Sequence, residues 1–183
     1  MRVQPLVYRI TETLENSFRK KEPPYSPGPE ELCKGIEHVV FEYSNFICAH
    51  HYMEANPEGG ALVVLVFNAF LVNCRQLMDF LGKVRSSRRY VLAVHYSRNP
   101  YRVLLPVSEK RRDAIDRQLA HISYGRVTDP RSELSDAQTR RDLFAELRGA
   151  FRDFLPTVKE EAHREEFTSR LLDRSKNLGL PLP

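Results

Sequence analysis

The feature that most constrains this chain is a long apolar segment, residues 59–83, that carries a line of polar side chains. On a helix of about 100° per residue, Asn68, Arg75 and Asp79 point within roughly 20° of one direction. An arginine taken out of water is costly unless an anion pairs with it, so we expect Arg75 to pair with Asp79. Truncating a fully buried Arg75 would then cost about 3 to 5 kcal/mol.

The same segment indicates a core helix and not a membrane span. Asn68, Asn73 and Arg75 interrupt it, which leaves its apolar run short of the ~20 residues that a bilayer crossing needs. Glycine is scarce, at 8 of 183 residues, and leucine-rich segments outnumber alternating Val/Thr stretches. The sequence therefore predicts an all-α protein, a single bundle of five to six helices with no membrane contact.

Prolines and apolar spacing mark the remaining helices. Residues 3–19 carry apolar side chains at steps of four, and the Pro-rich linker 21–29 ends this helix. Residues 1–156 are assigned to the bundle domain, and residues 157–183 to a charged C-terminal helix and tail. The other helices are expected from Pro29 to about residue 51, from the turn at 56–60 to residue 83, from Ser108 to about His121, and from an N-cap at Ser135 to Phe154.

Residues 86–107 leave two interpretations open. The apolar stretches YVLAVHY, at 90–96, and YRVLLPV, at 101–107, flank SRNP. Such a pattern fits a short hairpin, and it also fits an irregular insert with a helical turn. The pattern alone does not choose between them.

Cysteine usage and the two outer helices bear on compartment and association. Cys33, Cys48 and Cys74 lie in apolar helical patterns, which is typical of buried thiols in a reducing compartment, and no secretory leader opens the chain. A cytoplasmic protein is expected. The helices at 3–19 and 157–176 have narrow apolar stripes that a second copy could cover about a two-fold axis, so a homodimer is also expected.

Charge is concentrated between Phe80 and Ser108, where six basic residues and no acidic ones occur. Three tyrosines interleave with them, and arginine suits bidentate phosphate contacts and stacking on bases. This stretch is either a surface for single-stranded nucleic acid or a solvated basic loop whose tyrosines pack on the bundle. Its basic residues are Lys83, Arg85, Arg88, Arg89, Arg98 and Arg102.

A third feature is the segment 109–126, which brings acid-base groups together. If it is helical, Arg117 and His121 are one turn apart and Tyr124 lies on the same side. His121 could exchange a proton with a ribose hydroxyl while Arg117 or Arg126 stabilises a phosphoryl oxygen. In the structural alternative, His121 ends the helix and donates to a carbonyl group or to Asp79.

Two segments resemble known helical proteins. FNAFLVNCRQLMDFL, at 67–81, is followed by DRQLAHISYGR, at 116–126. The pairing resembles a group of uncharacterised bacterial helical-bundle proteins and, more loosely, the HEPN superfamily, over residues 60–126. Many HEPN proteins are ribonucleases of toxin and defence systems, although the spacing from Arg117 to His121 is shorter than in their Arg-to-His motif. The resemblance implies RNA or nucleotide binding and metal-independent RNA cleavage.

Two functions follow, and both place Asn68, Arg75 and Asp79 in one polar site with His121 and Tyr124. The first is an RNA- or nucleotide-binding bundle that cleaves RNA through His121, with Arg75, Arg117 and Arg126 on the phosphate. The second is a non-enzymatic interaction module whose polar network fixes the register of the helices. An open site favours the first function, and a mutually satisfied network favours the second. No metal or cofactor motif is found in the sequence.

Overall fold

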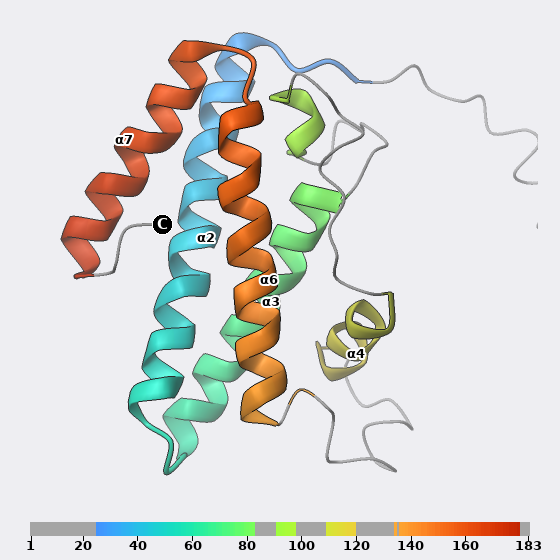
Figure 1. Cartoon of the computed structure of the whole chain (residues 1–183), viewed down its shortest axis with the longest axis vertical. Coiled ribbons are helices and arrows are strands. Elements are labelled where there is room, and N and C mark those ends of the chain that lie inside the picture. Colours follow the sequence, from blue (N-terminus) through green and yellow to red (C-terminus); the bar gives the residue numbers. More distant parts are fainter. Residues whose placement is uncertain (1–24, 83–90, 98–108, 120–133, 135, 180–183) are drawn as a thin grey trace, which may run out of the picture.

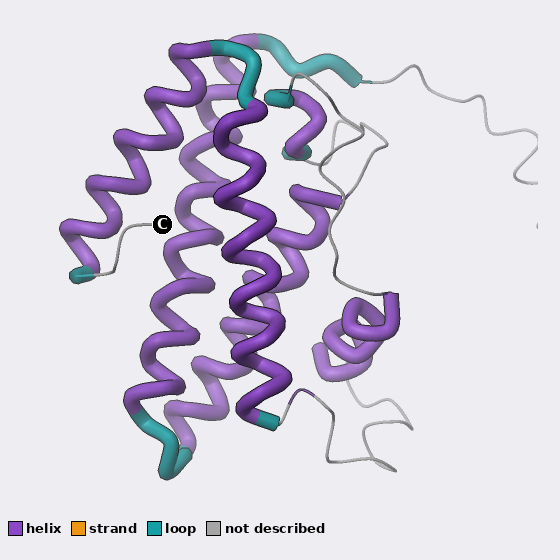
Figure 2. The backbone as a smooth tube through the Cα atoms, in the orientation of Figure 1, coloured by secondary structure: helices purple, strands orange, loops and turns teal. Residues whose placement is uncertain are grey.

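The computed structural model describes residues 25–82, 91–97, 109–119, 134 and 136–179, which form a helical bundle (Figure 1). Figure 2 shows that these residues form helices joined by loops, without a strand among them. The all-α prediction is confirmed. The described elements are α2 (Pro29–Ala55), α3 (Ala61–Gly82), the 3-10 turn η1 (Ala93–His95), α4 (Glu109–Leu119), α6 (Ala137–Phe154), the 3-10 turn η3 (Leu155–Thr157) and α7 (Glu161–Leu178).

The helices α2 and α3 form an antiparallel hairpin. Pro29 occupies the first position of α2, and the Glu31 carboxylate accepts a hydrogen bond from the backbone N–H of Gly28 at 2.9 Å. The helix runs to Ala55, one turn beyond the predicted end, because Asn56 precedes a proline and that position disfavours helical backbone. Gly59 and Gly60, with φ of 82° and 119°, then reverse the chain into α3.

Aromatic rings fill the centre of the bundle between α2, α3 and α6. Phe46 of α2 stacks on Phe70 of α3, with ring centroids 5.3 Å apart, and on Phe144 of α6 at 5.1 Å. Tyr43 stacks on Phe151 at 4.0 Å. These rings bury large apolar areas and hold the three helices at fixed distances.

The segment 91–97 closes one end of the bundle as a packed turn. Leu92, Ala93 and Tyr96 are all buried, which is not the period-two pattern of a strand, and η1 stands where a hairpin would need its first strand. The Tyr96 hydroxyl donates to the Leu32 carbonyl at 2.8 Å, and the Lys159 N–H donates to the Tyr96 carbonyl at 2.8 Å. The irregular alternative therefore holds for 91–97, and residues 86–90 and 98–107 lie outside the described part.

The ends of α6 and α7 differ from the sequence prediction. Asp136, not Ser135, is the N-cap of α6, and its carboxylate accepts from the Thr139 N–H at 2.7 Å. The turn η3 separates α6 from α7, which begins at Glu161 and not at 157. Phe167 of α7 is fully buried, so α7 packs into the same core as the other helices. The predicted helix at 3–19 lies outside the described residues.

The two halves of α3 differ in how deeply their side chains are buried. From Phe70 onward it contributes core residues such as Leu71, Leu77 and Leu81. Its first turns leave large apolar side chains in the open, with Leu62 55% and Leu65 65% exposed. The core-helix prediction holds best for residues 70–82, whereas in residues 61–69 Val63, Val66 and Phe67 are only partly buried against the core. By length and composition α3 could cross a membrane, a test that core helices also pass.

Candidate functional site

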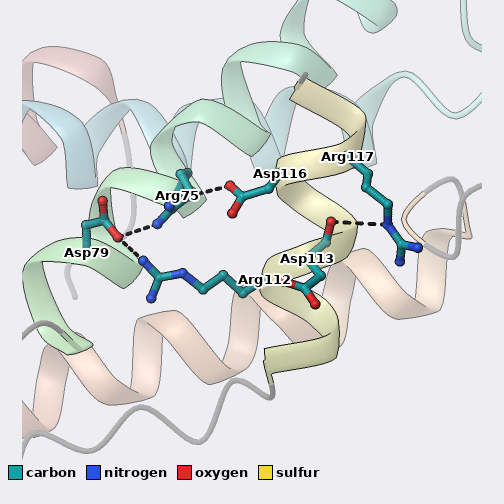
Figure 3. A network of polar contacts seen from close by, with 6 residues as sticks. All are labelled: Arg75, Asp79, Arg112, Asp113, Asp116 and Arg117. Atoms are coloured by element: carbon teal, nitrogen blue, oxygen red, sulfur yellow. Dashed lines mark hydrogen bonds and ion pairs between the residues drawn. The ribbon is translucent and has the colours of Figure 1, made fainter. Parts of the chain in front are cut away.

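The polar stripe of α3 meets charged side chains of α4 (Figure 3). The Arg75 Nε donates to Asp116 Oδ1 at 2.5 Å, and the Arg75 Nη1 donates to Asp79 Oδ1. The Arg112 Nη2 donates to the same Asp79 oxygen. The predicted Arg75–Asp79 pair is confirmed. We call these four residues, Arg75, Asp79, Arg112 and Asp116, the charge clamp.

Packing positions α4 so that the charge clamp can form. Ala114 and Ile115 are buried and anchor α4 on the bundle. Arg112 and Asp116 are one helical turn apart, as are Arg75 and Asp79, so each pair projects from one side of its helix. Cations and anions therefore alternate across the contact between α3 and α4, and each charge has an opposite neighbour.

The charge clamp is only partly buried. Its side chains range from 16% exposed for Asp79 to 46% for Asp116. Desolvation lowers the pKa of Arg75, but the hydrogen bond to Asp116 and the charges of both aspartates outweigh it, so the net shift of this pKa is upward. Because Arg75 keeps some water and Asp79 keeps Arg112, we expect the loss of Arg75 to cost about 1–2 kcal/mol, less than for a fully buried ion.

Two other residues of the predicted site lie apart from the charge clamp. Asn68 is half-buried on the same side of α3, two turns before Arg75, and among the described residues no hydrogen bond or ion pair joins it to Arg75 or Asp79. Arg117 is exposed, and its Nε donates to the Asp113 carbonyl at 3.3 Å (Figure 3). The face of α4 that meets α3 carries Arg112 and Asp116, with Arg117 about 100° beyond.

Several predicted site residues lie outside the described part of the chain, and their roles stay predictions. They include the proposed acid-base group and its neighbours, and most of the basic stretch. These residues are His121, Tyr124, Arg126, Lys83, Arg85, Arg88, Arg89, Arg98 and Arg102.

Sequence reasoning missed the partners that α4 supplies. Arg112 and Asp116 complete the charge clamp, and Arg111 binds Glu146 of α6 at 2.5 Å. The available signal was the i, i+4 spacing of Arg112 and Asp116, which equals that of Arg75 and Asp79. On a helix that is charged on most sides, this spacing alone does not say which side faces α3.

A small cleft lies beside the charge clamp, between α2 and α3. His38, Glu42, Gln76 and Asp79 line its polar side, and its volume is about 130 Å³. Ligand pockets usually measure roughly 300–1,000 Å³. The cleft has room for a few water molecules, and it is too small for a nucleotide.

The expectation of three buried thiols holds for Cys74 and is wrong for Cys33, which is exposed, while Cys48 is half-buried. Burial raises the pKa of the Cys74 thiol well above its usual range, which keeps it protonated. His50 stacks on Phe144 with ring centroids 3.6 Å apart, and burial lowers its pKa. Within the described ranges, no three His, Cys, Asp or Glu side chains converge to hold a metal ion.

Comparison with known proteins gives no relative for this chain. No protein family, no curated protein and no solved structure matches it.

Proposed function

We propose that this protein is a non-enzymatic helical interaction module in which the charge clamp is structural. One observation carries the proposal: the charges of Arg75, Asp79, Arg112 and Asp116 are satisfied by one another. Such a network fixes the register and orientation of α4 on α3. Each charged group of the charge clamp therefore already has a partner within the protein.

The chemistry of the described residues supports this interpretation. The upward shift in the pKa of Arg75 keeps its guanidinium charged, so it cannot transfer protons near neutral pH. The cleft beside Asp79, at about 130 Å³, does not admit a nucleotide. The thiol of Cys74 is fully buried and out of reach of any substrate.

The rest of the bundle offers a surface for binding. A rigid core and the charge clamp hold the second half of α3, while the exposed side of the helix presents Leu62, Leu65 and Val72 to the outside. Large exposed apolar patches on a folded domain mark interaction sites. The ribonuclease hypothesis depends on His121 and the basic stretch, and it remains a prediction that the experiment below tests.

A double-substitution cycle with Arg75→Gln and Asp116→Asn tests the structural role. We expect each single variant to lower the free energy of unfolding by about 1–2 kcal/mol, and we expect the pair to lose less than the sum, because the two residues share one interaction. Arg152→Gln is the matched control, since its ion pair with Asp153 is exposed, and it should change stability by less than about 0.5 kcal/mol. Chemical denaturation measures all four.

The enzymatic alternative needs its own assay. Single-stranded RNA is incubated with the wild type and with His121→Ala in the presence of a chelator, and we expect intact RNA in both. Cleavage by the wild type that His121→Ala abolishes would overturn the proposal. RNA binding with a salt slope of about −0.7 per phosphate, lost in the Arg88→Glu/Arg89→Glu variant, would instead favour a nucleic-acid-binding bundle.

A further inference from the structure

Side chains at the surface of two neighbouring helices, α3 and α2, follow the same regular spacing. Leu62, Leu65, Ala69 and Val72 of α3 follow the three-four-three spacing of a coiled-coil seam, and all four are exposed. We call these four residues the α3 stripe. Its next position is Gln76, so the apolar pattern stops where the charge clamp begins.

A groove runs beside the α3 stripe, between α3 and α2, and Leu178 and Gly179 at the end of α7 also line it. It has a volume of about 810 Å³ and includes Ala69 of the stripe. Its α2 wall repeats the same spacing over the same length of eleven residues, about 16 Å of helix. The residues of this wall at that spacing are Asn45, Cys48, Tyr52 and Ala55.

The described part of this surface has no acidic, lysine or arginine side chain, and it has one histidine, His51, in the groove. A nucleic acid or an anionic membrane would need Lys or Arg here, and at the nearby end of the hairpin the guanidinium of Arg141 is paired with Glu54, while Glu58 adds a second carboxylate. A neutral, apolar surface is complementary to a copy of itself, since no like charges oppose one another about a two-fold axis.

We propose that this surface binds a second copy of the chain, with the α3 stripe of each copy packed against the groove of the other. The two antiparallel α2–α3 hairpins then form a four-helix layer about a two-fold axis. This proposal rests on the interaction-module function and names its partner. The α3 stripe and the groove lining comprise fewer residues than the roughly 20–30 a side of a standard interface, so we expect a reversible dimer with a Kd of roughly micromolar order.

Sedimentation velocity of the full chain, from low micromolar concentration upward, tests the proposal. We expect the mass to rise from the monomer value of 21.3 kDa toward twice that value. Leu65→Glu places a charge at the centre of the α3 stripe and should hold the mass at the monomer value throughout. Val64→Glu is the matched control: Val64 is 59% exposed but lies on the Asn68 side of α3, so this variant should associate like the wild type.

Circular dichroism and thermal unfolding at low concentration show whether each variant folds. If Leu65→Glu does not fold, Leu65→Gln removes the apolar contact without adding a charge, and we expect it to weaken dimerisation at least tenfold. A wild type that stays monomeric overturns the proposal. If the wild type is monomeric and its Tm falls strongly in Leu65→Gln, another part of the same chain covers the α3 stripe, which also overturns the proposal. Flotation of the wild type with anionic vesicles, lost in Leu65→Gln, overturns it in favour of a membrane surface.

The two proposals fail in different experiments. A monomeric wild type removes the second copy as partner and leaves the structural role of the charge clamp untouched. Metal-independent RNA cleavage that His121→Ala abolishes removes the non-enzymatic function whatever the mass of the protein.

Discussion

The two halves of α3 have similar apolar sequences and different surroundings. Residues 70–82 supply buried side chains such as Phe70 and Leu77, and the polar stripe of this half is bound by α4. Residues 61–69 are at least as apolar, yet Leu62 and Leu65 are more than half exposed. Apolar composition therefore favours burial along the whole helix, and the positions of the neighbouring helices determine which half is more deeply buried.

A matched pair of leucine substitutions tests this contrast most strongly. Leu77, in the second half, is 1% exposed, and Leu65, in the first half, is 65% exposed. We expect Leu77→Ala to lower the free energy of unfolding by about 2–5 kcal/mol, because it leaves a cavity in the core. Leu65→Ala, measured on dilute protein, should cost less than about 0.5 kcal/mol, because no packed neighbour is lost.

Urea denaturation monitored by circular dichroism gives both values. Similar losses at the two positions would break the contrast, since they would mean that the first half of α3 is covered within the same chain. A loss at Leu65 that grows with protein concentration would sharpen it, because association would then be the source of the stability.

A second test concerns how tightly side chains pack at the end of the bundle that the segment 91–97 closes. A Cβ atom at Gly35 would lie 2.9 Å from Val91 Cγ1 and would collide with the Tyr96 hydroxyl, which donates to the Leu32 carbonyl. We expect Gly35→Ala to destabilise the fold by about 1–3 kcal/mol, in spite of the better helix propensity of alanine.

Gly149 of α6 is the control for this test. Apart from the backbone of its own helix, no atom lies within 4 Å of a Cβ placed there, so Gly149→Ala should raise the free energy of unfolding by up to about 1 kcal/mol. Thermal unfolding compares the two variants. A stabilising Gly35→Ala would show that the closed end is looser than its contacts indicate.

The smallest expected effect is on the pH dependence of stability, through His50 in the core. Burial lowers the pKa of His50, so the unfolded chain takes up the proton at a higher pH than the folded chain does. This contribution to stability is present in full above the ordinary histidine pKa and is lost as the pH falls toward the lowered value. We expect His50→Phe, which keeps the stack on Phe144, to flatten the decline in stability between about pH 7 and pH 5.

His38→Phe is the comparison, because it makes the same substitution at a side chain that is 63% exposed and lies 3.9 Å from Glu42. One histidine can change the free energy of unfolding by no more than about 1.4 kcal/mol per pH unit. An unchanged slope in His50→Phe would assign the pH dependence to other groups, of which His95, whose pKa burial also lowers, is the first candidate.

Local rules in the sequence were sufficient for the helices and for one ion pair. Apolar periodicity, together with Pro29 and the turn at 56–60, located α2 and α3 to within a few residues. The Arg75–Asp79 pair was predictable because both partners lie one turn apart on a single helix. Such features depend on neighbours in the sequence, whose geometry is nearly constant in any helix.

Only the tertiary structure decided the remaining contacts. Arg112 and Asp116 complete the charge clamp because Ala114 and Ile115 are buried and set the rotation of α4. The turn at 91–97 is held by Tyr96 and Lys159, residues far apart in the sequence. The exposure of the α3 stripe depends on which helices cover α3. Each of these outcomes depends on the packing of several distant segments at once, and no periodicity within one segment encodes it.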